Sequence, residues 1–195
     1  MPREVDHVAR RRELADAACA VIARHGLIAT TMAHVAEESG WSIGSMRHYF
    51  PTKDELIGSA LWRVGERVDE RIRRRTAGGM TLADLRTAML ELLPLDARRR
   101  QESLVYLAFV AQSVVVPELA EAAEDAARRL QRPLADRVRH LVRSGEVARD
   151  LDPAHEAARL RVLLDGLSIQ LVSTPRRTTR KWATKVVDDH LAALG

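Results

Sequence analysis

The sequence predicts an all-α protein of about nine helices, and three observations support this. Glycine and proline interrupt the 195-residue chain at intervals that suit helices. Apolar residues recur at the spacing of one helix face, and no segment alternates apolar and polar residues between hairpin turns. The chain is 46% hydrophobic and only 4% aromatic, which is enough apolar material for one or two domains with buried cores.

The first helix is expected over residues 5–24. Gly26 follows it and can end the helix in a left-handed conformation. The apolar residues of this segment fall on one helical face, which consists of Leu14, Ala18, Val21 and Ile22.

Two short helices are expected next, over residues 31–39 and 43–49. Gly40 can adopt the positive φ of a tight turn between them, and the Ser42 hydroxyl can cap the second of the two. Pro51 prevents that helix from continuing.

A long fourth helix is expected from Thr52 to about Arg75. Thr52 at the cap position and Glu55 three residues later form the pattern of a capping box. The Gly78-Gly79 pair after this helix is the clearest linker signal in the chain.

We place the domain boundary in the fourth helix rather than at the glycine pair, because so long an apolar stripe needs partners on both sides. The expected domains are a smaller one over residues 1–53 and a larger one over residues 54–195. The larger domain should contain five further helices, at residues 81–93, 98–115, 117–143, 153–172 and 177–194.

The charge balance is weakly basic. The chain has 31 Lys and Arg against 27 Asp and Glu, a formal net charge of +4, which favours a nucleic-acid partner only weakly. Residues 1–53 hold seven basic and six acidic residues, a net charge of only +1. Any prediction of DNA binding therefore depends on where particular residues lie.

Three features predict a cytoplasmic protein without a membrane segment. Cys19 is the only cysteine, so no intrachain disulfide indicates an oxidising compartment. The longest segment without a charged residue, Ser103 to Pro117, has 15 residues, whereas a membrane helix needs about 20. The apolar segment after Arg12 contains Asp16 and has helical spacing, unlike a signal peptide.

Residues 31–49 contain two short helices joined by a turn with a glycine, which is the arrangement of a helix-turn-helix. In that motif the second helix enters the DNA major groove. The segment resembles the DNA-binding domain of the TetR family of transcriptional regulators over about residues 8–60. The residues that match at the family's spacing are Gly26, Thr31, Val35, Ala36, Gly40, Ser42, Gly44, Phe50, Lys53 and Leu56.

The resemblance implies a homodimer that binds double-stranded DNA and carries a ligand pocket in its larger C-terminal domain. It further implies a ligand-responsive regulator, for which repression is the favoured role. A small-molecule effector would release this regulator from its operator. The two recognition helices would enter successive major grooves about 34 Å apart, so the operator should be a palindromic inverted repeat. The effector would favour a dimer state with the wrong separation, and the fourth helix is the expected lever.

The DNA-contacting residues are expected at the start of the second helix, along the third helix and at the start of the fourth. Thr31 can present its hydroxyl and a backbone N–H to a phosphate, Gly44 lets the backbone approach DNA closely, and Lys53 can hold a phosphate. The full set of candidates is Thr30, Thr31, Trp41, Ser42, Gly44, Ser45, Arg47, His48, Tyr49 and Lys53.

Two of these positions depart from the family pattern. Arg47 stands where the family usually has tyrosine, and an arginine can bind either guanine O6 and N7 or a phosphate, so both roles stay open. Trp41 replaces a smaller apolar residue, and packing within the motif is the favoured role for it over reading DNA.

Two other classes of protein are alternatives to a regulator, namely a hydrolase and a helical dimerisation module. Gly40-Trp41-Ser42-Ile43-Gly44 matches the nucleophile elbow of hydrolases, but that motif needs a strand before the serine and here a helix is expected. A hydrolase using Cys19 is also disfavoured, because no local histidine faces it and a small core residue is the simpler reading. A helical dimerisation module that does not bind DNA is the third class.

No metal or cofactor is expected. His155 and Glu156 begin like a zinc-protease motif, but Arg159 occupies the position of the second histidine. The other histidines also lack ligand spacing.

The last two expected helices each carry an apolar stripe that would suit an intrachain core, but the resemblance to the TetR family favours a dimer interface of four helices. Gly166 would leave room for a closely packed neighbour. The residues assigned to dimerisation are Leu160, Leu164, Gly166, Leu167, Leu171, Ala183, Val187 and Leu191.

An apolar wall with a few polar groups suggests a ligand pocket in the C-terminal domain. Ordinary core packing is the alternative for each residue taken singly, and Asp165 could either meet a cationic ligand or pair with an arginine. The ligand-binding candidates are Trp62, Met89, Tyr106, Phe109, Gln112 and Asp165.

Overall fold

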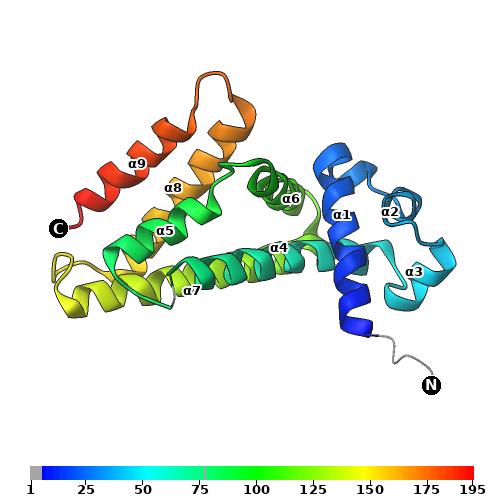
Figure 1. The fold of residues 1–195 in the computed structure, drawn as a ribbon, viewed down its shortest axis with the longest axis horizontal. Helices are drawn as coiled ribbons and strands as arrows, with labels where there is room; N and C mark the ends of the chain where they lie inside the picture. The colour runs from blue at the N-terminus through cyan, green and yellow to red at the C-terminus, as the bar shows by residue number, and fades with distance from the viewer. Residues whose placement is uncertain (1–5, 77) are drawn as a thin grey trace. The chain divides into compact units, whose positions relative to one another are not determined.

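A computed structural model describes residues 6–76 and 78–195, and its regular elements are all helices (Figure 1). No strand occurs among these residues. The elements are α1 (His7–Ala29), α2 (Met32–Ser39), α3 (Ile43–Tyr49), α4 (Lys53–Thr76), α5 (Leu82–Leu92), α6 (Ala97–Ser113), the short 3₁₀ helix η1 (Pro117–Leu119), α7 (Ala120–Ser144), α8 (Pro153–Ser173) and α9 (Arg180–Ala192). The predicted all-α fold of about nine helices is therefore confirmed.

The turn residues act as the sequence predicts. Gly26 interrupts the regular conformation of α1 with a φ of 78°, and only a last short turn follows it. Gly40 ends α2 in the left-handed region with a φ of 73°, which an L-residue with a side chain rarely adopts. Thr52 caps α4, since its hydroxyl accepts a hydrogen bond of 3.2 Å from the backbone N–H of Glu55.

The described chain forms two compact units. One comprises the residues up to Glu66 together with Leu104–Ala123, and the other comprises Arg67–Ser103 and Glu124–Gly195. The division falls inside α4, and α6 and α7 are also shared between the units. The functional boundary after residue 53 stays a prediction.

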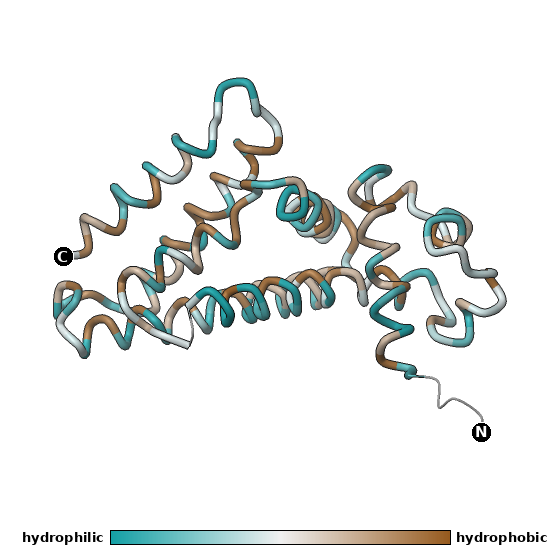
Figure 2. Tube along the Cα trace, in the orientation of Figure 1, coloured by the Kyte–Doolittle hydropathy of each residue, from teal (hydrophilic) through white to brown (hydrophobic). Residues whose placement is uncertain are grey.

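Each unit has a core of its own, built from one face of its helices. Figure 2 shows hydrophobic and hydrophilic residues alternating along the helices, as expected for elements that are buried on one side. In the N-terminal unit the core includes Leu14, Ala18, Ile22, Val35, Met46, Phe50 and Leu56. In the other unit it includes Leu85, Met89, Leu141, Leu160, Leu164 and Val187.

None of the helices in the described part of the chain is both long enough and apolar enough to cross a membrane.

Candidate nucleic-acid interface

Helix α3 is held to the N-terminal unit by Met46 and by Phe50, which directly follows it, and exposes most of its other residues to solvent. Met46 and Phe50 are both 0% exposed, whereas Gly44, Ser45, Arg47 and His48 are exposed. A helix of seven residues is too short to be stable alone, so these two anchors hold it in place. The outcome is a rigid helix with a polar outer face, as a recognition helix requires.

The turn before α3 is fixed by hydrogen bonds. The backbone N–H of Trp41 donates to the carbonyl of Ala36 over 3.1 Å. The Ser42 hydroxyl accepts from the backbone N–H of Ser45 over 3.1 Å and also bonds the Ser45 hydroxyl over 2.8 Å. Ser42 thus acts as the predicted helix cap, and the element that precedes it is helix α2 rather than the strand of a nucleophile elbow.

Gly44 is a glycine that the fold itself does not require. It lies inside α3 without a positive φ, and a Cβ added there would meet nothing closer than the Ser42 hydroxyl, at 3.9 Å. Glycine inside a helix costs about 0.5–1 kcal/mol relative to alanine. Neither packing nor backbone conformation therefore requires a glycine at this position.

Trp41 packs against α1, as predicted for it. Its indole N–H donates to Glu13 over 3.2 Å, and the Arg10 guanidinium lies 5.4 Å from the centre of its ring. The Arg10 hydrogen bond and then the Trp41 bond lower the pKa of the Glu13 carboxyl. These contacts tie the turn of the motif to α1 and occupy the polar end of Trp41, so its place among the DNA contacts is not supported.

The two threonines before α2 have different roles. Thr31 is exposed, and its hydroxyl caps α2 by accepting from the backbone N–H of His34 over 3.2 Å. Thr30 is only 1% exposed, and its hydroxyl donates to the carbonyl of Gly26 over 2.7 Å. The prediction of a DNA contact at Thr30 is therefore wrong, because this side chain closes the end of α1 inside the unit.

Lys53 lies at the start of α4, where a phosphate contact was predicted. Its ammonium group donates to the backbone carbonyl of Ile28 over 3.2 Å and so links α4 to the end of α1. The ammonium has three protons, and one carbonyl uses only one of them. A phosphate contact at Lys53 stays a prediction.

Sequence reasoning missed two residues of α1 that touch the end of α3. The Arg11 guanidinium donates to the carbonyl of Tyr49 and lies 4.2 Å from the ring centre of Phe50. The His7 ring lies 5.4 Å from the ring of Tyr49 and 6.1 Å from that of His48. His7 and Arg11 are four residues apart and so share one helix face, but this spacing does not indicate which element they contact.

The predicted dimerisation stripes lie in the core of the second unit. Seven of the eight residues are at most 7% exposed there, namely Leu160, Leu164, Leu167, Leu171, Ala183, Val187 and Leu191. This is the intrachain alternative, and it corrects the assignment of these side chains to a dimer surface. The same two helices instead expose Val162, Ile169 and Trp182, which are 73%, 49% and 39% exposed. Gly166 is exposed between the first two.

The predicted ligand-binding residues fall in both units, and the structure does not bring them to one described pocket. Met89 and Phe109 are buried core residues, Tyr106 and Gln112 are half-buried, and Trp62 is 49% exposed. Asp165 pairs with Arg161 at 3.6 Å, which is the arginine alternative that the sequence left open. The pocket stays a prediction.

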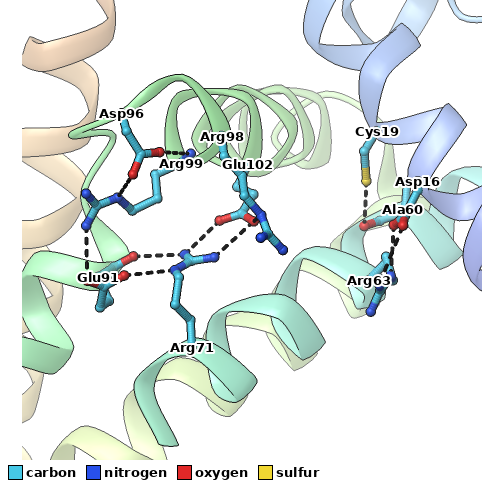
Figure 3. A network of polar contacts seen from close by, with 10 residues as sticks. All are labelled: Asp16, Cys19, Ala60, Arg63, Arg71, Glu91, Asp96, Arg98, Arg99 and Glu102. Atoms are coloured by element: carbon cyan, nitrogen blue, oxygen red, sulfur yellow. Dashed lines mark hydrogen bonds and ion pairs between the residues drawn. The ribbon is translucent and has the colours of Figure 1, made fainter. Parts of the chain in front are cut away.

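A buried ion network holds α4, α5 and α6 together in the second unit (Figure 3). Arg71 donates to Glu91 over 2.9 Å and to both carboxylate oxygens of Glu102 over 3.1 and 2.8 Å. Burial disfavours the charge on Arg71, but its bonds to Glu102 and then Glu91 outweigh this, so its pKa is raised. Arg75 and Arg99 add further ion pairs to Glu91 at 3.1 and 3.3 Å.

The residues weighed for a hydrolase, Cys19, and for a zinc site, Glu156, both have bonding partners within the fold. Cys19 is 1% exposed and its thiol donates to the carbonyl of Ala60 over 3.4 Å (Figure 3), as expected of a core residue. Glu156 bonds His190 over 2.7 Å and Arg159 over 2.9 Å. No group of three metal-ligating side chains occurs in the two described segments of the chain.

Comparison with known proteins identifies the family. Residues 14–60 match the model of bacterial regulatory proteins of the tetR family, and residues 82–195 match that of the C-terminal domain of BetI-type transcriptional repressors. The chain is 29% identical to the HTH-type transcriptional regulator PksA of Bacillus subtilis, covering 100% of this chain and 94% of that protein. It is also 29% identical to the regulator BetI of Burkholderia mallei, covering 100% and 97%.

Solved structures of other transcriptional regulators have the same fold as this chain. A transcriptional regulator from Saccharomonospora viridis, solved in complex with choline, is 26% identical and superimposes with a TM-score of 0.83 over 95% of this chain and 96% of that one. A regulator from Rhodococcus is 28% identical, with a TM-score of 0.80 over 94% and 95%. With both family matches, the chain belongs to the TetR family of transcriptional regulators.

Proposed function

We propose that this protein is a repressor that binds an inverted-repeat operator as a homodimer and is released by a small-molecule effector. The observation that carries the proposal is the outer face of α3, which is polar and exposed and contains a glycine that folding does not need. A helix of this kind fits the major groove, where side chains reach base edges and a glycine lets the backbone come close.

The proposed DNA contacts lie on α3 and at the starts of the helices on either side of it. Arg47 and Ser45 lie on the outer face of α3 and reach base edges or phosphates, whereas Thr31 and Lys53 flank the helix and hold phosphates. His48 and Tyr49 extend the interface along the last turn of α3. This arrangement places the specific contacts on a helix and the backbone contacts at the starts of its neighbours.

The proposed dimer uses the outer face of α8 and α9. Val162, Gly166 and Ile169 follow one another at four- and three-residue intervals, so they share one face of α8, and Trp182 adds an exposed aromatic on α9. A Cβ at Gly166 would meet nothing within 4 Å in the chain itself. An exposed apolar face with an unfilled glycine suits a second copy packed in twofold symmetry.

Release by the effector follows from a difference in affinity between two dimer states. A ligand that binds more tightly to a dimer with the wrong head separation lowers DNA affinity by that difference. Choline, which the Saccharomonospora neighbour binds, is the first compound to screen. We propose that the protein acts by binding rather than by catalysis, and in the cytoplasm, where its operator lies.

Selection of bound duplexes from a random pool tests the proposal. The expected product is an inverted repeat with half-site centres about one helical turn apart, bound with an affinity that falls as salt rises. Val162→Asp should give a monomer in sedimentation velocity and lose most of this affinity, whereas His155→Asp, at an exposed polar position of α8, should leave both unchanged. Failure to recover any duplex would favour the helical dimerisation module and contradict the proposal.

A further inference from the structure

Three aromatic rings meet where the first turn of α1 approaches the last turn of α3. The ring centre of His7 lies 5.4 Å from that of Tyr49 and 6.1 Å from that of His48, and His48 and Tyr49 are 5.5 Å apart. Both histidines are exposed, and Tyr49 is half-buried. The two imidazoles are therefore close to each other and open to solvent on one side.

This cluster is held in place from below and continues the exposed face of α3. Arg11, one turn after His7, donates to the backbone carbonyl of Tyr49 and lies over Phe50. Phe50 is fully buried, so the end of α3 and the start of α1 are fixed relative to each other within one compact unit. His48 follows Arg47 directly, which places His7 at the edge of the proposed DNA surface.

We propose that His7 belongs to the DNA interface, where it and His48 together bind one phosphate of the operator when protonated. A phosphate oxygen accepts an N–H bond at about 2.8 Å, so two rings about 6 Å apart can each donate to a different oxygen of the same phosphate. The inference rests on the proposed function, because it requires that α3 docks on DNA. It adds α1 as a third element of the interface.

The charged residues next to the two imidazoles at the start of α1 have partners of their own. Asp6 lies next to His7, and its carboxylate accepts the backbone N–H of Ala9 as the cap of α1. Arg10 pairs with Glu13 at 2.9 Å, and Arg11 is bonded to the Tyr49 carbonyl. Tyr49 is in ring contact with both imidazoles, and the charged residues nearest to them along the chain are Asp6, Arg10 and Arg11 at the start of α1 and Arg47 on α3.

A phosphate placed between the rings adds negative charge and favours the imidazolium forms. DNA binding therefore takes up protons, and by linkage the affinity for DNA must rise as the pH falls through the range in which imidazole changes charge, between pH 5 and 8.

Fluorescence anisotropy with the selected duplex tests this between pH 6 and 8 at constant salt. We expect the dissociation constant of the wild-type protein to rise about tenfold over this range, that of His7→Gln about threefold, and that of the double variant with His48→Gln under twofold. At pH 6 the salt slope of His7→Gln should be smaller than that of wild type by about one. His155→Gln, an exposed histidine of the other unit, is the matched control and should keep the wild-type profile.

The outcomes separate this inference from the proposed function. If the wild-type protein binds the duplex and His7→Gln shows the same pH profile and salt slope, the inference is overturned and the proposed function stands. If no duplex is recovered from the pool, the proposed function fails and the inference fails with it. His7 is exposed, so circular dichroism should show that its glutamine variant folds as wild type does.

Discussion

Helices α3 and α8 both present an exposed face with a glycine that the fold does not require, but the two faces differ in chemistry. On α3 the glycine is Gly44 and its exposed neighbours include Ser45, Arg47 and His48. On α8 it is Gly166, and its neighbours Val162 and Ile169 are apolar. A polar face with an arginine suits the charged groove of DNA, whereas an apolar face suits a second protein copy.

The two helices also differ in how they are held. Helix α3 depends on two buried anchors, so most of its side chains are free to make outside contacts. Helix α8 buries a full stripe of leucines and exposes only what lies opposite that stripe. Surface chemistry can therefore be changed at the exposed positions of α3, such as Ser45, Arg47 and His48, with little loss of stability, but on α8 only at positions off the stripe.

The largest expected effect contrasts the buried arginine Arg71 with exposed arginines. Arg71→Met removes the cation that bridges Glu91 and Glu102 and leaves them only their ion pairs with Arg75, Arg99 and Arg98, so the free energy of unfolding should fall by about 3 kcal/mol. Arg74→Met, at an exposed position of the same helix, should change it by less than about 0.5 kcal/mol. Urea denaturation measures both, and equal effects would show that the network contributes no more than surface charge.

The next contrast sets the two faces of α8 against each other. Leu164→Ala opens a cavity in the core and should lower the free energy of unfolding by about 2–5 kcal/mol. Val162→Ala should change the fold stability by less than about 0.5 kcal/mol but weaken dimerisation about tenfold. Urea midpoints and sedimentation velocity at several protein concentrations separate the two effects. A dimer unaffected by Val162→Ala would refute the proposed outer face.

A smaller effect is expected at the cap of α3. Ser42→Ala removes the bond to the Ser45 backbone and should cost about 1 kcal/mol of stability, with only a modest loss of DNA affinity. Ser42→Thr keeps a capping hydroxyl and should stay near wild type. If Ser42→Ala instead abolished a measurable esterase activity of the wild-type protein, the hydrolase alternative would regain support.

The smallest effect on stability is expected at Gly44. Substitution there should stabilise the fold but weaken DNA binding. Gly44→Ala should raise the free energy of unfolding by about 0.5 kcal/mol, because the helix gains a better helix former and its Cβ has room. The affinity for the selected duplex should nevertheless fall at least about tenfold, because the methyl group blocks close approach of the backbone. Gly65→Ala on α4 is the control, since its Cβ is equally unobstructed.

Much of the motif was predictable because its signals are local. Gly26, Gly40 and Ser42 act within a few residues of their own position, and all three behave in the structure as their residue types indicate. Thr30 and Thr31 are adjacent and chemically alike, so the sequence did not show that one of them is buried. The contacts of His7 and Arg11 with Tyr49 join residues far apart in the chain, which helix spacing alone does not reveal.

The leucine stripe of α8 shows a different limit. Residues at intervals of three and four face one direction, but the spacing does not say whether the partner belongs to the same chain or to a second one. The structure assigns the stripe to the core, and the informative residues for a partner are Val162, Gly166 and Ile169, which break the expected polar face.

The most direct test of a DNA-reading α3 is the binding of wild type and Arg47→Ala to the selected duplex and to its single-base variants. Arg47→Ala should lose about 1–3 kcal/mol of binding free energy. A base contact would relax the preference at one base pair of each half-site, and a phosphate contact would weaken all duplexes equally. Unchanged affinity and unchanged preference in Arg47→Ala would contradict the central claim that the exposed face of α3 binds DNA.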